Sequence, residues 1–196
     1  MNPLFDAIPT PADWQVVTVR DQAEADRLIP ELLAIAGVSR FVRVELGAGP
    51  IELSFGDSEG LPTNLEPFRE RADLIGLVIV AGECGPDARP CHPVWLRSLR
   101  DQCEAAGVPF AFAGWGEFVP WCDLNDPDMA TRVTARIPLM DLKFGSRMMP
   151  DGTFPAGTGA VVDRHEYMRL GAHMLPVGPE LSGRSLDGRT HDGGAS

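Results

Sequence analysis

Two glutamates follow apolar runs of this sequence at points where the chain turns. Glu45 ends one such run, and Glu83 lies two residues beyond the apolar run 74–81. Two carboxylates that are held close together can act as a general acid and base or as metal ligands. A structural role is the alternative, because the same carboxylates could cap helix N-termini or pair with Arg43 and Arg89.

The loop after Glu83 is rich in glycine and proline and carries further polar groups. Gly82 and Gly85 let a ligand approach the backbone, Arg89 adds positive charge, and a helix that starts after His92 offers free N–H groups. These features favour an anionic ligand such as a carboxylate or a phosphate. His92 is a candidate acid–base group. The structural alternatives are an ion pair within the loop for Arg89 and a hydrogen bond at the helix start for His92.

Trp115 and Glu117 follow a further apolar run, 108–113. In an α/β fold the carboxyl ends of the strands meet at one face, where ligands usually bind. We therefore predict one candidate site at the strand ends, with no metal assigned to it. The catalytic candidates are Glu83, Glu45 and His92. The ligand-binding candidates are Gly82, Gly85, Arg89 and Trp115.

Runs rich in valine, isoleucine and phenylalanine predict strands, and apolar residues spaced by three and four predict helices. The strands are expected at Trp14–Arg20, Arg40–Glu45, Leu74–Ala81 and Val108–Ala113. The helices are expected from the capping residue Asp21 to about Ala36, and at Pro93–Ala106. The third strand is apolar almost throughout, which is typical of a strand covered on both faces. Val78 and Val80 should therefore be nearly fully buried.

Strands joined by helix-containing, right-handed connections predict an α/β fold with a parallel sheet. Four such units make about half of an eight-stranded barrel. The predicted fold class is therefore a partial, TIM-like barrel of about four parallel strands with an irregular carboxyl-terminal extension. We assign residues 1–121 to the partial barrel, 122–181 to the extension packed on it, and 182–196 to a flexible tail. Within the extension, 132–142 is a candidate strand and 163–171 a candidate helix.

The open edges of a half barrel need a cover, because an unpaired strand invites pairing with another chain. We expect either the region Phe144–Leu175 or a protein partner, which could be a second copy of the chain, to provide it. The net charge of −11 argues against a broad nucleic-acid or anionic-membrane surface. No apolar run approaches the length of a membrane span, and the polar start is no signal peptide. A soluble protein is expected.

The four cysteines contain no Cys-x-x-Cys pair. Such a set could form two disulfides or a zinc site, but free buried thiols are common inside cells. Structural thiols are the favoured interpretation, and no cofactor is predicted. Cys84 and Cys91 are the one pair that merits a test as ligands.

The loop residues resemble those of a known family. The segment Gly82–Trp95, Gly-Glu-Cys-Gly-Pro-Asp-Ala-Arg-Pro-Cys-His-Pro-Val-Trp, is similar to the loop of phage and prophage proteins catalogued as phage gene product thirty-seven/sixty-eight. The resemblance continues through Arg97–Cys103 and Ala105–Phe110 to Trp115–Glu117. It covers most of residues 14–121.

This resemblance implies a radical-SAM-like barrel, in which the amino-terminal half of the family carries three cysteines that hold a four-iron, four-sulfur cluster. The present sequence resembles the carboxyl-terminal half, and none of its cysteines matches the cluster motif. The favoured interpretation is a non-catalytic binding or structural phage protein, located in the host cytoplasm or the virion. The alternative is an enzyme that uses Glu45, Glu83, Arg89 and His92, completed by a metal or a partner chain.

Overall fold

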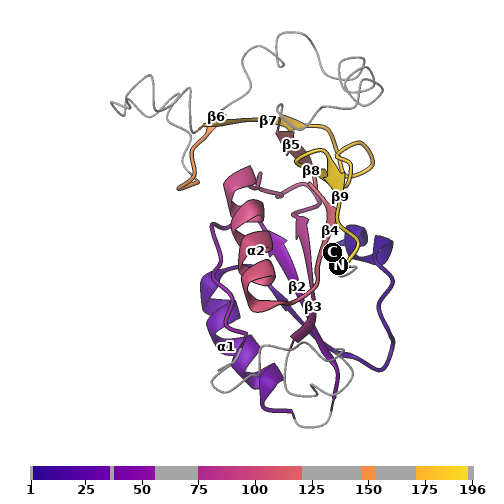
Figure 1. Ribbon diagram of the computed structural model, residues 1–196. Helices are drawn as coiled ribbons and strands as arrows, with labels where there is room; N and C mark the ends of the chain where they lie inside the picture. Colours follow the sequence, from indigo (N-terminus) through magenta and orange to yellow (C-terminus); the bar gives the residue numbers. More distant parts are fainter. Residues whose placement is uncertain (1, 36–37, 56–74, 121–146, 153–170, 194–196) are drawn as a thin grey trace.

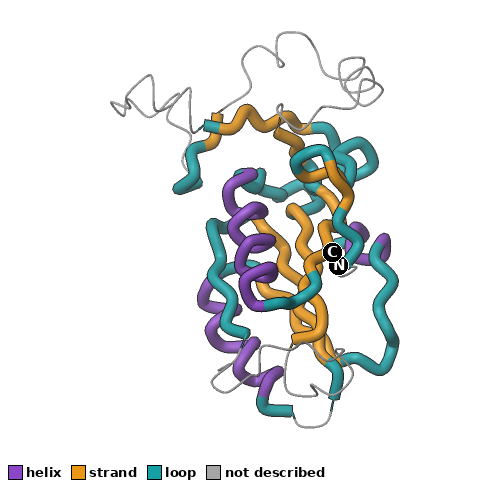
Figure 2. The backbone as a smooth tube through the Cα atoms, in the orientation of Figure 1, coloured by secondary structure: helices purple, strands orange, loops and turns teal. Residues whose placement is uncertain are grey.

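The computed structural model describes residues 2–35, 38–55, 75–120, 147–152 and 171–193 (Figures 1 and 2). The order of elements along the chain is η1 (Pro3–Ala7), β1 (Gln15–Val19), α1 (Gln22–Leu33), β2 (Arg40–Leu46), β3 (Ile75–Gly82), α2 (Pro93–Ala106), β4 (Phe110–Gly114), β5 (Phe118–Pro120), β6 (Arg147–Met148), β7 (Ala172–Pro176), β8 (Ser185–Leu186) and β9 (Arg189–Thr190). The four strands and two helices predicted up to residue 114 are all present, with their ends shifted by up to three residues.

Both helices begin where local sequence signals place them, and α2 also ends at its signal, whereas α1 ends at Leu33, three residues before the expected end. The Asp21 side chain accepts a hydrogen bond from the Glu24 N–H at 2.8 Å, and the Glu24 carboxylate accepts one from the Arg20 N–H at 2.9 Å. This arrangement is close to a capping box. Helix α2 starts at Pro93 and stops at Gly107, whose φ of 66° is the left-handed conformation that favours glycine.

The four long strands form one parallel sheet in the order β1-β2-β3-β4. Neighbouring strands therefore follow one another in sequence, as in a (βα) barrel, whereas the strand order of a doubly wound sheet reverses. The described residues contain no closed barrel. The fold is thus α/β with a four-stranded parallel sheet, which is compatible with a partial barrel.

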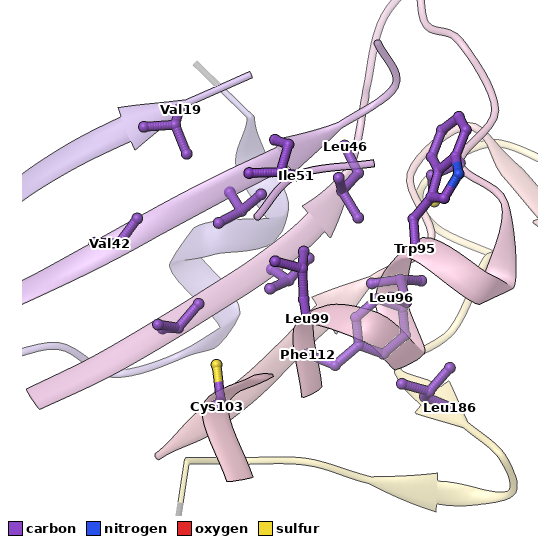
Figure 3. Packing of buried hydrophobic residues seen from close by; sticks show 14 of the residues in the cluster. Val19, Val42, Leu46, Ile51, Trp95, Leu96, Leu99, Cys103, Phe112 and Leu186 are labelled. Carbon is purple, nitrogen blue, oxygen red and sulfur yellow. The ribbon is translucent and has the colours of Figure 1, made fainter. Parts of the chain in front are cut away.

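Helices α1 and α2 cover one face of this sheet, which we call the helix side (Figure 1). Alternate residues of β2 and β3 point there and pack against the apolar stripes of both helices (Figure 3). Val78 and Val80 are fully buried, as predicted. The largest side chains in this core include Trp95, Leu96, Leu99 and Phe112.

The opposite face, which we call the concave side, is covered by the chain's own amino-terminal segment (Figure 1). Phe5 and Ile8 pack there with Ala81 and Ala111, whose small side chains leave room for the short helix η1. Element η1 contacts β3 and β4. No periodic pattern in the sequence predicts this cover, because a single 3₁₀ turn is too short to show one.

The outer edge of β4 is closed by residues 191–193. The Phe112 N–H donates to the His191 carbonyl at 2.8 Å, and the Gly193 N–H donates to the Phe110 carbonyl at 3.2 Å. No other described strand pairs with β1 on the side away from β2. The expected cover from Phe144–Leu175 is not found at the β4 edge in the parts of that region that the structure describes.

Those parts contribute β6 and most of β7, which form a small antiparallel sheet with β5, in the order β5-β7-β6, beyond the carboxyl ends of the long strands (Figure 1). Residues 185–190, which the sequence analysis assigned to a flexible tail, form the hairpin β8–β9. Its two turn residues, Asp187 and Gly188, have φ angles of 53° and 75°, and Asp-Gly is a strong signal for such a turn. The predicted strand 132–142 and the predicted helix 163–171, apart from residue 171, lie outside the described residues.

Candidate functional site

Glu83 lies directly after β3, and its carboxylate is held by Arg89 from the same loop. The Arg89 backbone N–H donates to Glu83 Oε2 at 2.7 Å, and the guanidinium Nη2 lies 2.5 Å from Oε1. The hydrogen bond to Glu83 raises the pKa of Arg89 above its usual value. The side chain of Glu83 is 13% exposed and that of Arg89 54%. The structure thus realises the ion-pair alternative for these two residues.

The glycines of the loop serve close backbone packing. A Cβ on Gly82 would lie 2.0 Å from the Trp115 carbonyl oxygen, and one on Gly116 would lie 2.1 Å from that of Glu83. The loops after β3 and β4 therefore touch, and the Glu117 N–H donates to the Glu83 carbonyl at 2.9 Å. Gly85 is different: its φ is +108°, its Cα faces open space, and its N–H donates to Glu117 Oε1 at 2.9 Å.

Glu45, at the end of β2, also has partners on both carboxylate oxygens. Asn2 Nδ2 donates to Oε1 at 2.9 Å, and Arg20 Nε donates to Oε2 at 3.1 Å. Its cationic partner is therefore Arg20 rather than Arg43. Asn2 also donates to the Gly82 carbonyl at 2.8 Å, so it ties the ends of β2 and β3 together.

The thiol of Cys84 lies 3.2 Å from Asn2 Oδ1, beside these carboxylates. Burial and the negative charges of Glu117 and Glu45 raise its pKa to about 11. Burial raises the pKa of Cys91 and of Cys103 to about 12. All three are free thiols, and a pKa this high keeps them protonated near neutral pH.

His92 is 2% exposed and caps helix α2. Its Nδ1 accepts a hydrogen bond from the Val94 N–H at 3.2 Å, and its ring lies 6.4 Å from that of Trp95. This contact realises the structural alternative, a hydrogen bond at the helix start.

Trp115 is 1% exposed and belongs to the helix-side core. Its indole N–H donates to the Ser185 carbonyl at 2.9 Å, and its ring meets Phe112 edge to face at 5.2 Å. In this position Trp115 joins the sheet to the β8–β9 hairpin and presents no open ring surface to a ligand.

A family model matches residues 2–194, which is nearly the whole chain. The chain belongs to DUF5131. The description of this family is "Protein of unknown function". No curated protein and no solved structure matches the chain.

In this DUF5131 protein the strand ends carry two adjoining sets of hydrogen bonds: Asn2 links Glu45 to the Gly82 carbonyl, and the Glu83 carbonyl accepts the Glu117 N–H. Sequence reasoning missed Asn2, because no local pattern links it to a carbonyl that lies 80 residues away. The described residues contain no group of three or more His, Cys, Asp or Glu side chains that could hold a metal ion. No helix in the described part is long and apolar enough to cross a membrane.

Proposed function

We propose that this DUF5131 protein is a non-catalytic binding or structural protein, built on half of a barrel of the radical-SAM type. One observation supports this role: all three catalytic candidates already have partners within the fold. Glu83 is bound to Arg89, Glu45 to Asn2 and Arg20, and the His92 Nδ1 to the start of α2. The proposed phage or prophage origin, in host cytoplasm or virion, rests on the resemblance of the loop residues.

The charged groups at the strand ends are paired with one another, which favours a structural role for them over a catalytic one. A general base needs a free lone pair within reach of the proton that it abstracts. Both oxygens of Glu83 accept N–H groups of Arg89, so a substrate would first have to separate this ion pair. The neighbouring Cys84 is protonated near neutral pH and is therefore a poor nucleophile. These contacts hold the two loops in one arrangement that a partner can recognise.

The enzyme alternative makes a different prediction for the purified protein. We would purify the protein without oxygen, treat it with iron and sulfide, and record its absorbance spectrum, its iron and sulfide content, and reductive cleavage of S-adenosylmethionine. The expected result is neither a bound cluster nor cleavage, because the described residues contain no group of three cysteines that could anchor a cluster. Stoichiometric iron and sulfide together with cleavage would overturn the proposal. Comparing the rate of cleavage in Glu83→Gln with that in Glu104→Gln, which changes an exposed glutamate, would then show whether Glu83 takes part in the reaction.

A further inference from the structure

One arginine in the described part of the chain differs from the others that are buried or half-buried. The buried or half-buried arginines with oxygen partners are Arg40, Arg97, Arg100 and Arg184, and the exposed Arg20 and Arg89 have oxygen partners as well. Arg43 is half-buried, yet it makes no hydrogen bond or ion pair with any described residue, and its Nε is buried without an acceptor. Arg27 and Arg189 make no hydrogen bond or ion pair with a described residue either, but both are exposed to water.

Arg43 lies in the middle of β2 on the concave side. Its Cζ is 5.3 Å from the ring centroid of Phe5 and 5.4 Å from that of Phe41. The rings stabilise the positive charge through cation–π contacts, which act on the face of the guanidinium. They leave its in-plane N–H groups without acceptors, and those groups are suited to grip a carboxylate with two parallel hydrogen bonds.

The nearest carboxylate on the same strand is already taken. Glu45 lies two residues further along β2 and therefore points to the same side of the sheet. Its two oxygens accept hydrogen bonds from Asn2 and Arg20. A positive charge is thus left half-buried on the concave side without a counter-charge from the described residues.

Next to this charge, the described residues leave part of the concave side exposed. Element η1 contacts β3 and β4. Thr18 of β1 is the register partner of Arg43, and Val16 is the register partner of Phe41. Thr18 is half-buried and Val16 is 42% exposed. A guanidinium, a hydroxyl and an exposed apolar side chain therefore adjoin on one surface.

We propose that Arg43 is the anchor of a carboxylate-binding site on the concave side, with Val16 contacting the apolar body of the ligand. A single guanidinium matches the single charge of a carboxylate, whereas a phosphate dianion needs further donors. The carboxylate comes either from a free small molecule or from an acidic side chain of a second copy of the chain. This site lies apart from the strand-end loops and does not depend on the function proposed for them.

The test uses the Nε–H signals of the arginines in ¹⁵N–¹H NMR spectra, with Arg43 assigned through its absence in Arg43→Lys. Benzoate serves as the probe, and benzamide is its neutral counterpart of the same shape. We expect benzoate to move the Arg43 signal to saturation, and benzamide to leave it unchanged. No movement with benzoate, or equal movement with both compounds, would overturn the site.

A thermal-shift measurement provides matched variants. Benzoate should raise the melting temperature of the wild-type protein and of Arg27→Lys, which changes an exposed arginine of α1. The rise should disappear in Arg43→Lys, since lysine lacks the Nε–H and the forked geometry. An undiminished rise in Arg43→Lys would place the benzoate site elsewhere. If Arg43→Lys does not fold, the Arg43 Nε–H signal is assigned through its bonds to the backbone of residue 43, and the wild-type titration decides.

The two sources of the carboxylate differ in their dependence on protein concentration. If a second copy provides it, the Arg43 signal should move as the protein is concentrated, light scattering should show a doubled mass, and benzoate should reverse both changes. If a free ligand provides it, the mass should stay that of a monomer and the benzoate titration should not depend on protein concentration.

Discussion

The two faces of the central sheet are built in different ways. On the helix side, β2 and β3 pack against two regular helices through large apolar side chains such as Leu96 and Phe112. On the concave side, the cover is the single turn of η1, and the sheet contributes alanines together with the charged Arg43 and Glu45. The helix side is a continuous apolar core, whereas the concave side combines a small apolar cluster with the charged side chains of Arg43 and Glu45.

The two faces of the sheet therefore contribute differently: the helix side supplies most of the stability, and the concave side supplies polar groups that require particular partners. Burial of large apolar side chains gives the main favourable free energy of folding. Buried polar groups stabilise the fold only when their partners are in place. We therefore expect substitutions on the helix side to cost more stability than matched substitutions on the concave side, whose charges can accept a new partner.

The largest effect should follow from Val78→Asp, which places a carboxylate in the helix-side core where Val78 is fully buried. An unpaired buried charge costs several kcal/mol, which is comparable to the whole stability of a typical domain of about 5–15 kcal/mol. The variant should fail to fold in soluble form, whereas Val78→Ala should fold with reduced stability. Expression tests and thermal melts decide this, and a soluble Val78→Asp protein with a cooperative melt would contradict it.

The next residue provides the matched test on the concave side. Ile79 is also fully buried, but its register partner on β2 is Arg43. Ile79→Asp should lose about 2–5 kcal/mol for the removed apolar side chain and regain part of it by pairing with Arg43. We expect a folded protein that is more stable than Ile79→Asn in urea unfolding. Equal stability of the Asp and Asn variants would show that Arg43 is not available for pairing.

A smaller effect is expected from Asn2→Ala. This substitution removes the hydrogen bonds by which Asn2 links the ends of β2 and β3 on the concave side. The substitution leaves the Gly82 carbonyl and Glu45 Oε1 without a donor, at a cost of about 1–3 kcal/mol. The urea midpoint should fall, and the Cys84 thiol beside Asn2 should react faster with a thiol reagent. An unchanged urea midpoint and an unchanged rate of thiol reaction would mean that the Asn2 hydrogen bonds do not stabilise the ends of β2 and β3.

The smallest effect concerns Asp187, whose carboxylate pairs with Arg97 and Arg100 of α2. Hydrogen bonding to Arg97, followed by Arg100, lowers the pKa of Asp187 below 3.8. The contribution to stability is therefore present above pH 3.8 and is lost as the pH falls through the lowered pKa. Because these groups are part-exposed, Asp187→Asn should cost at most about 1 kcal/mol, and less in high salt.

Asn is the right substitution for this measurement, since it tolerates the left-handed turn conformation at position 187. The difference in unfolding free energy between the wild type and Asp187→Asn should shrink as the pH is lowered below 3.8. A difference that does not change with pH or salt would indicate that the Arg–Asp pairs contribute nothing.

Local patterns predicted the helix side well. Helix α2 has the predicted bounds, Pro93–Ala106, because its apolar spacing, its proline start and Gly107 all act within a few residues. The concave side could not be predicted in this way. Its cover comes from η1, and the adjoining β4 edge is closed by residues 191–193. Both segments are short, have no periodicity, and meet the sheet only in the folded chain.

For the candidate site, too, the sequence predicted which residues lie near each other but not which of them form contacts. The sequence placed Glu83 and Arg89 in one loop and left open whether they bind a ligand or each other. The structure pairs them, since a tight loop brings residues 83 and 89 together. For Glu45 the sequence offered Arg43, the neighbour on its own strand. Arg20 takes that place, because the turn into α1 carries its side chain over the end of β2.

The segment 191–193 along β4 has a consequence for assembly. A strand from another molecule could pair with this edge only by displacing a segment tethered to the same chain. Tethering gives such a segment an effective concentration of the order of millimolar, which a separate molecule rarely reaches. The β4 edge is thereby shielded from strand exchange and from fibril-like stacking, so among the described strands of the parallel sheet β1 is the edge at which strand addition could start.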